Sequence, residues 1–92
     1  METELSRVVR EYVLWVDGLE YSVKGRVCEI VDADPAIRYK WAVSHHYRPS
    51  SSASAAYYPS ATHGRSVEEV EALMIGYLKN FTGIGVVKNG QF

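Results

Sequence analysis

Residues 38–48, RYKWAVSHHYR, show the clearest hydrophobic pattern in the chain. Apolar and aromatic side chains alternate there with polar or basic ones, and a period of two residues is typical of a β-strand. One face of the predicted strand would be apolar and would carry Tyr39, Trp41, Val43, His45 and Tyr47. The other face would be basic and exposed to solvent, as antiparallel sheets allow, and would carry Arg38, Lys40, Ala42, Ser44, His46 and Arg48.

Residues 7–16, RVVREYVLWV, are rich in Val and aromatic side chains, which favours a second strand. Apolar side chains between residues 4 and 16 also occur at helical spacing, so a helix is the alternative. Asp17-Gly18 follows, and this pair predicts a type I′ hairpin turn because both turn positions need a positive φ. The turn favours the strand interpretation.

A third strand is expected after this turn, where alternation runs from Leu19 to Val31. Gly25 interrupts the alternation and is a candidate β-bulge. Asp32, Asp34 and Pro35 are turn-forming residues, and they predict the end of the strand.

A helix is predicted over residues 67–81. Ser66 and Glu69 match the S-x-x-E capping box that begins many helices, and Gly83 is well placed to end it. One apolar stripe follows at helical spacing; it consists of Val67, Val70, Met74, Tyr77, Leu78 and Phe81. We expect short strands at 57–59 and 84–87, and a turn at Asn89-Gly90.

The order of these elements predicts an α+β domain spanning residues 1–92. Its antiparallel sheet would have three to five strands, and the helix at about 67–81 would pack on the face that carries Tyr39, Trp41 and Val43. The opposite face would stay open. A chain of 92 residues with 47% apolar residues and a net charge of −1 is ordinary for one soluble domain.

The sequence also bears on location. Its apolar runs are too short for a transmembrane helix, and residues 1–11 lack the apolar core of a secretory signal. The single cysteine, Cys28, cannot form an intramolecular disulfide, and we expect it to be a packing residue in a reducing compartment. We therefore expect a cytoplasmic protein that does not enter a membrane.

Catalytic motifs are not evident. The serines of residues 49–56, PSSSASAA, lack a G-x-S-x-G elbow, and residues 82–90, TGIGVVKNG, match no phosphate-binding loop. His45 and His46 would point to opposite faces of a strand, and no acid or cysteine lies between His46 and His63 to complete a zinc site. We expect no enzyme activity, no cofactor, and no catalytic or metal-binding residues.

The charges are unevenly distributed along the chain. Between Asp34 and Glu68 there is no acidic residue, whereas this segment holds all three His, four Tyr, Trp41 and four Lys or Arg. Such a composition suits an acidic protein surface or nucleic acid, and it is also common on a plain solvent-exposed strand face. The low-complexity loop 49–56 would add flexible contacts. The candidate partner-binding residues are Arg38, Lys40, His46, Arg48, Tyr57 and Tyr58.

Two family resemblances follow from these features. ATHGRSVEEVEALMIGYL, with Gly64, Ser66, Glu68 and Glu69, resembles the strand–turn–helix signature of small bacterial and phage proteins such as HicB-type antitoxins, over about a fifth of the chain. The Gly-Gly-Tyr hairpin and the Pro-Asp-Leu-Pro-Gly-like run of HicB are missing. In format, a short chain with a hairpin-rich sheet and one helix, the protein is similar to small phage-encoded inhibitors of the anti-CRISPR kind, which implies binding and occlusion of a larger partner.

We therefore expect a non-catalytic protein-binding module, an inhibitor from a phage or mobile element whose partner is a larger host protein or nucleoprotein complex. The alternative is a small nucleic-acid-binding domain that uses the basic, aromatic sheet face. Both hypotheses are compatible with a homodimer, because a strand at residues 8–16 would be apolar on both faces and one helix cannot cover both.

Overall fold

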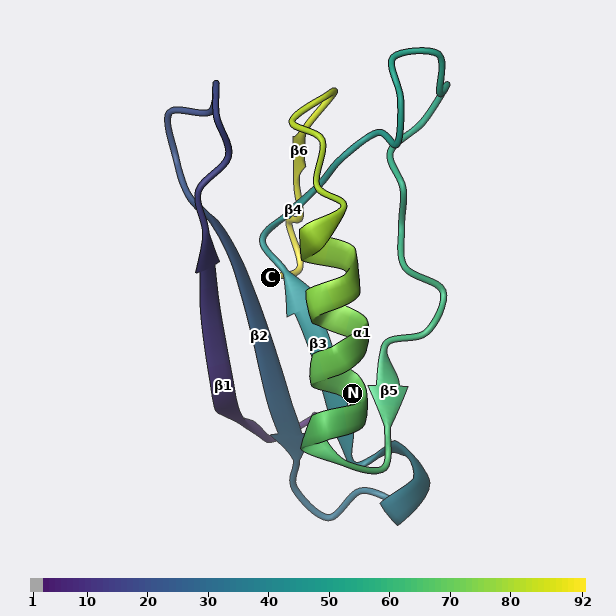
Figure 1. The fold of residues 1–92 in the computed structure, drawn as a ribbon. Helices are drawn as coiled ribbons and strands as arrows, with labels where there is room; N and C mark the ends of the chain where they lie inside the picture. The colour runs from purple at the N-terminus through teal and green to yellow at the C-terminus, as the bar shows by residue number, and fades with distance from the viewer. Residues whose placement is uncertain (1–2) are drawn as a thin grey trace.

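The structure is a computed structural model that describes residues 3–92. It is an α+β fold, as the sequence predicts. A four-stranded antiparallel sheet has the order β1-β2-β3-β5, and one helix, α1, packs on one of its faces (Figure 1). The strands are β1 (Ser6–Leu14), β2 (Val23–Ile30), β3 (Tyr39–Val43) and β5 (His63–Gly64). The helix α1 spans Val67–Lys79, and a 3-10 turn, η1 (Pro35–Ile37), precedes β3.

The strand interpretation of residues 7–16 is confirmed, but the tight hairpin after it is wrong. The two strands pair from Ser6 with Ile30 to Leu14 with Val23, so the connection spans residues 15–22. Within it, the Leu19 N–H donates to the Val16 oxygen at 3.1 Å. Only Gly18 of the two central residues has a positive φ, +90°, whereas a type I′ turn needs two. The alternating residues Leu19 and Tyr21 therefore lie in a loop.

The predicted bulge at Gly25 is also wrong, because the irregularity lies in β1. The register shifts between Val8 and Arg10, so Val9 is the extra residue. Gly25 instead marks a place where side chains of α1 lie directly against the β2 backbone. A Cβ atom there would lie 2.9 Å from side-chain atoms of Leu78 and Met74, so a larger residue would push the helix away.

The strand predicted over residues 38–48 ends at Val43, which corrects the placement of His46. The Ser44 N–H still donates to the Lys24 oxygen, but the Ser44 oxygen accepts a hydrogen bond from Asn89 at the far end of the chain. Residues 45–46 then form β4, which pairs with β6 (Val87–Lys88) in a separate two-stranded sheet. Alternation fails across this break: His46 and Tyr47 are both buried, and His46 lies on no exposed basic face.

The core lies between α1 and the sheet, on the face that carries Trp41 and Val43, as predicted. The helix begins at the Ser66 cap, whose hydroxyl accepts the Glu69 N–H at 3.1 Å. It ends at Lys79, two residues before the predicted end, and Phe81 packs against the core from outside the helix. The buried core residues are Val23, Val27, Trp41, Val43, Tyr47, Val70, Met74, Tyr77 and Leu78.

Two short segments differ from their predictions. Residues 57–59 form no strand, and Tyr57 makes only an isolated bridge with Tyr47. The last strand is β6, and a turn follows it, in which the Phe92 N–H donates to the Asn89 oxygen. No helix within residues 3–92 is long and apolar enough to cross a membrane.

Candidate functional site

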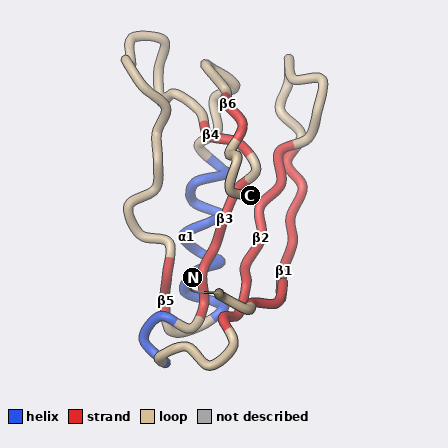
Figure 2. Tube along the Cα trace, turned by 180° about the vertical axis from the view of Figure 1, so that it is seen from behind, coloured by secondary structure: helices blue, strands red, loops and turns tan. Residues whose placement is uncertain are grey.

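Three connections project at the same end of the elongated molecule, as both views show (Figures 1 and 2). They are residues 15–22 between β1 and β2, residues 49–56 after β4, and residues 80–86 between α1 and β6. We call the surface formed by these connections, together with Arg48, Tyr57 and Tyr58 at the base of loop 49–56, the loop end. Loops held by a rigid sheet and helix are the usual place for binding residues.

The three connections contact one another through specific pairs. The Arg48 N–H donates to the Ile84 oxygen at 2.8 Å, and the Thr82 hydroxyl donates to the Arg48 oxygen at 2.6 Å. A Cβ atom added to Gly83 would lie 3.3 Å from Val16, so residues 80–86 also touch residues 15–22. The loop end is therefore one connected surface.

Large aromatic side chains are exposed at the loop end. Trp15 is 75% exposed and Tyr58 is 61% exposed, and both Tyr21 and Tyr57 are more than a third exposed. Residues 49–56, PSSSASAA, which precede Tyr57 and Tyr58, are rich in Ser and Ala. Tyr and Trp provide large contact areas at low entropic cost, and Ser adds adaptable hydrogen bonding, a combination that antibody binding loops also use.

A buried polar network anchors the base of loop 49–56 to the helix. The Tyr77 hydroxyl donates to the Tyr57 oxygen at 2.6 Å, and its oxygen lies 3.1 Å from Nδ1 of His46. The hydroxyl has one proton, which it gives to Tyr57, so Nδ1 of neutral His46 carries the hydrogen and donates to it. Aromatic packing of Tyr58 on His46 extends the network to the surface.

Burial determines the protonation states in this network. Loss of solvation raises the pKa of the Tyr77 hydroxyl, with a further contribution from Tyr47, so Tyr77 remains a donor. Loss of solvation also lowers the pKa of His46, and His45 beside it adds to the effect. His46 is therefore neutral and structural at neutral pH, and it supports the loop end from below.

Charges at the loop end are mixed. Asp17 and Glu20 are exposed on residues 15–22, whereas Arg48 and Lys88 lie near the second sheet. His45 stacks on Tyr21 with ring centroids 4.7 Å apart. Burial lowers the pKa of His45, and Lys88 lowers it further. The loop end thus combines aromatic area with both signs of charge.

The structure does not bring the six sequence-predicted residues together. Arg48, Tyr57 and Tyr58 belong to the loop end, and His46 is buried beneath Tyr58. Arg38 directly follows η1, at the opposite end of β3 from the loop end (Figure 1). Lys40 lies on the sheet face away from α1. The predicted continuous basic strand face does not exist, because the chain leaves the sheet at Ser44.

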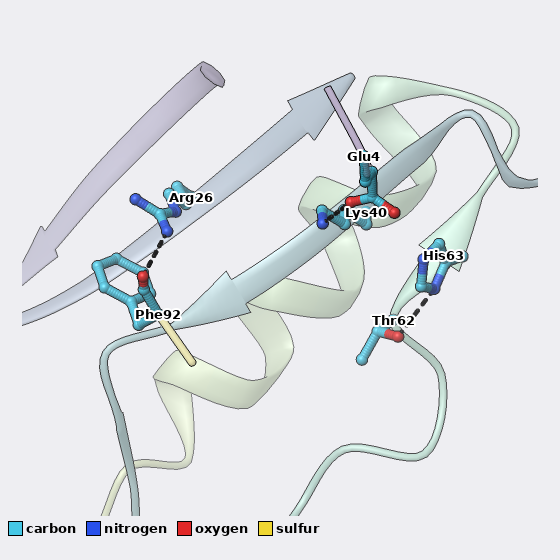
Figure 3. A network of polar contacts seen from close by, with 6 residues as sticks. All are labelled: Glu4, Arg26, Lys40, Thr62, His63 and Phe92. Atoms are coloured by element: carbon cyan, nitrogen blue, oxygen red, sulfur yellow. Dashed lines mark hydrogen bonds and ion pairs between the residues drawn. The ribbon is translucent and has the colours of Figure 1, made fainter. Parts of the chain in front are cut away.

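The sheet face away from α1 is partly covered by segments near both ends of the chain (Figure 3). Glu4 forms an ion pair with Lys40. The Arg26 guanidinium lies 4.0 Å from the centroid of the Phe92 ring and donates to the Phe92 backbone oxygen at 2.8 Å. These contacts engage Arg26 of β2 and Lys40 of β3, while Lys24 at the start of β2 stays exposed, so this face is not the continuous basic surface that the sequence predicts.

Sequence reasoning missed Trp15 and Tyr21 as candidate binding residues. The sequence pattern places both in strands, because Asp17-Gly18 predicts a tight hairpin. The signal that could have found them is the aromatic pair flanking the turn residues in WVDGLEY. Within residues 3–92, no group of three or more His, Cys, Asp or Glu side chains is arranged to hold a metal ion.

Comparison of the chain with protein-family models, with curated proteins and with solved structures finds no match.

Proposed function

We propose that the chain is a non-catalytic protein-binding module that contacts its partner through the loop end. Its mode of action would be that of a small phage or mobile-element inhibitor, which occludes a larger host protein or nucleoprotein complex. The observation that carries the proposal is the convergence of three connected loops that expose Trp15, Tyr21, Tyr57 and Tyr58.

The physical argument rests on how these side chains are held. Aromatic anchors contribute most to binding when their position is fixed before the partner arrives, because less conformational entropy is then lost. Tyr57 packs against Tyr77 with ring centroids 5.4 Å apart, and Tyr58 packs on His46 at 4.6 Å. Both anchors are thus positioned by core residues, while their exposed faces remain free for a partner.

The nucleic-acid alternative has less support. Affinity for nucleic acid depends on several cations that track one phosphate backbone. Here Lys40 is paired with Glu4, and Arg26 is engaged by Phe92. Arg38 and Arg48 lie beyond opposite ends of β3. We therefore treat nucleic-acid binding as an outcome that the experiment must distinguish.

The experiment is an affinity pull-down from lysate of the source organism, with and without nuclease, read by mass spectrometry. Two charge reversals form a matched pair, because Arg48→Glu lies at the loop end and Arg38→Glu lies at the opposite end of β3. We expect the wild type and Arg38→Glu to capture the same protein after nuclease treatment, and Arg48→Glu to lose it.

Equal capture by both folded variants would refute the loop end as the binding surface. Loss of the captured protein after nuclease would instead favour the nucleic-acid alternative. Circular dichroism of each variant shows whether the fold is intact.

A further inference from the structure

Arg48 is held in place by the connection between α1 and β6. Its N–H donates to the Ile84 oxygen at 2.8 Å, and its backbone oxygen accepts the Thr82 hydroxyl at 2.6 Å. Its side chain lies along the Gly85 backbone, because a Cβ atom added to Gly85 would lie 2.7–2.9 Å from its Cγ, Cδ and Nε atoms. Gly85 has a φ of +56°, in the left-handed region that favours glycine. Residues 82–85 therefore fix both the backbone and the side-chain stem of Arg48.

The guanidinium group at the end of this stem has no partner within residues 3–92. It donates no hydrogen bond and forms no ion pair there, whereas the guanidinium groups of Arg7, Arg10 and Arg26 each contact a carboxylate or a carbonyl oxygen. Arg48 is also partly buried, and a charge that has lost part of its hydration gains most from an opposite charge. Because the stem is fixed beforehand, little entropy is lost when the guanidinium binds. This arrangement favours an anion at Arg48.

The chain around Arg48 carries no acidic side chain. Residues 35–67 and 72–92 contain no Asp or Glu, and they include β4, β6 and two of the three connections at the loop end. The acidic residues of the loop end are Asp17 and Glu20, which are exposed on the third connection. In both views residues 80–86 lie between the other two connections (Figures 1 and 2). The loop end is thus positive around Arg48 and negative on its other side.

This division of charge distinguishes between two kinds of partner. Nucleic acid presents a continuous line of phosphates, so Asp17 and Glu20 would repel it. A protein surface can place a carboxylate opposite Arg48 and a cation opposite the two acids, which makes the charges complementary on both sides. The planar guanidinium also matches a carboxylate, because two of its N–H groups can donate to the two carboxylate oxygens.

We infer that Arg48 is the carboxylate-binding residue of the loop end, that it receives an Asp or Glu side chain of the partner protein, and that Gly85 positions it. This inference rests on the proposed function and names the chemistry of one contact within it.

The test is an NMR titration of the isotope-labelled protein with N-acetyl-glutamate, followed at the Nε–H signals of the arginine side chains. We expect the Arg48 signal to shift and to saturate with an affinity about tenfold higher than that of Arg65. Arg65 is the internal control, because it is exposed and its guanidinium likewise forms no ion pair within residues 3–92. N-acetyl-glutamine, which lacks the charge, is expected to leave the Arg48 signal unchanged.

Gly85→Ala tests the positioning of Arg48. The added Cβ would overlap the Arg48 side chain, so we expect the affinity of Arg48 for N-acetyl-glutamate to fall about tenfold. Gly90→Ala is the matched control, because a Cβ atom there meets nothing within 4 Å, and it is expected to titrate like the wild type. Equal affinities in the two variants would refute the role of Gly85. If Gly85→Ala does not fold, the comparison of Arg48 with Arg65 in the wild type still decides whether Arg48 binds a carboxylate.

Three results would overturn the carboxylate site. They are an Arg48 signal that responds no more strongly than Arg65, an equal response to N-acetyl-glutamine, and tighter binding of dimethyl phosphate, which mimics a nucleic-acid backbone. The pull-down separates the two proposals. A partner protein that Arg48→Gln still captures would refute this inference alone. A wild type that captures no protein, but whose Arg48 binds N-acetyl-glutamate as expected, would refute the proposed function and support the carboxylate site.

Discussion

Replacing Tyr77 with Phe removes one oxygen atom from the network that joins α1 to loop 49–56. The ring still fills its place in the core, where Tyr77 is 5% exposed. The hydroxyl donates to the Tyr57 oxygen at 2.6 Å and accepts from His46 at 3.1 Å, so both partners lose a hydrogen bond. A buried polar group that is left unsatisfied costs about 1–3 kcal/mol.

His46 is only 9% exposed, whereas Tyr57 is 48% exposed, and water can replace part of the bond at Tyr57. We therefore expect Tyr77→Phe to lower the free energy of unfolding by about 2 kcal/mol. Urea slopes of small domains are about 1–3 kcal/mol/M, so the urea midpoint should fall by roughly 0.7–2 M.

The assay is urea denaturation followed by circular dichroism. Tyr58→Phe is the matched control, because the Tyr58 hydroxyl makes no hydrogen bond within residues 3–92, and we expect its midpoint to equal that of the wild type. Substitutions at neutral surface positions usually change the free energy of unfolding by less than about 0.5 kcal/mol. If the free energies of unfolding of Tyr77→Phe and the wild type differ by no more than this, the network does not stabilise the fold and the reasoning is refuted.

Two further outcomes are expected from the same kind of measurement. Gly25→Val should destabilise the protein by about 1–3 kcal/mol, because a Cβ at that position would lie 2.9 Å from atoms of Leu78 and Met74. Gly76→Ala, on the open side of α1, is the control and should stabilise the protein by about 0.5–1 kcal/mol. Equal changes in stability for the two variants would contradict the close approach of α1 to Gly25. Because the pKa of His46 is lowered on folding, mainly by burial, the unfolded chain binds more protons below pH 6.5, so stability should fall as the pH decreases from 6.5 towards the folded-state pKa. His46→Gln should weaken this dependence, although His45, which faces the same region and has a lowered pKa of its own, will retain part of it; an unchanged pH profile would show that His46 is not the group responsible.

Local patterns determined the elements whose signals are contained within a few residues. Ser66 begins the helix as its capping side chain predicts, because the bond to the Glu69 N–H spans only three residues. The stripe from Val67 to Leu78 determined which face of α1 is buried, and the alternation at Tyr39, Trp41 and Val43 determined the matching face of β3. These features were enough to establish the α+β class.

The end of β3 was decided by a contact that no local pattern contains. Asn89 bonds to Ser44 and to Val43 from the far end of the chain, and its side-chain nitrogen lies 2.9 Å from the Val43 oxygen. This contact turns the chain out of the sheet, so His46 points to Tyr77 and not to solvent. Because of the same turn, Arg48 lies outside β3 and does not share a strand face with Lys40.

The sequence by itself thus determined the class of the fold, the start and buried face of the helix, and the buried face of the central strand, because periodicity and capping act over neighbouring residues. The tertiary structure alone decided which side chains share a surface. Trp15, Tyr21 and Tyr58 are all exposed at the loop end, where three connections that are distant in the chain are linked through contacts of Arg48, Thr82 and Gly83.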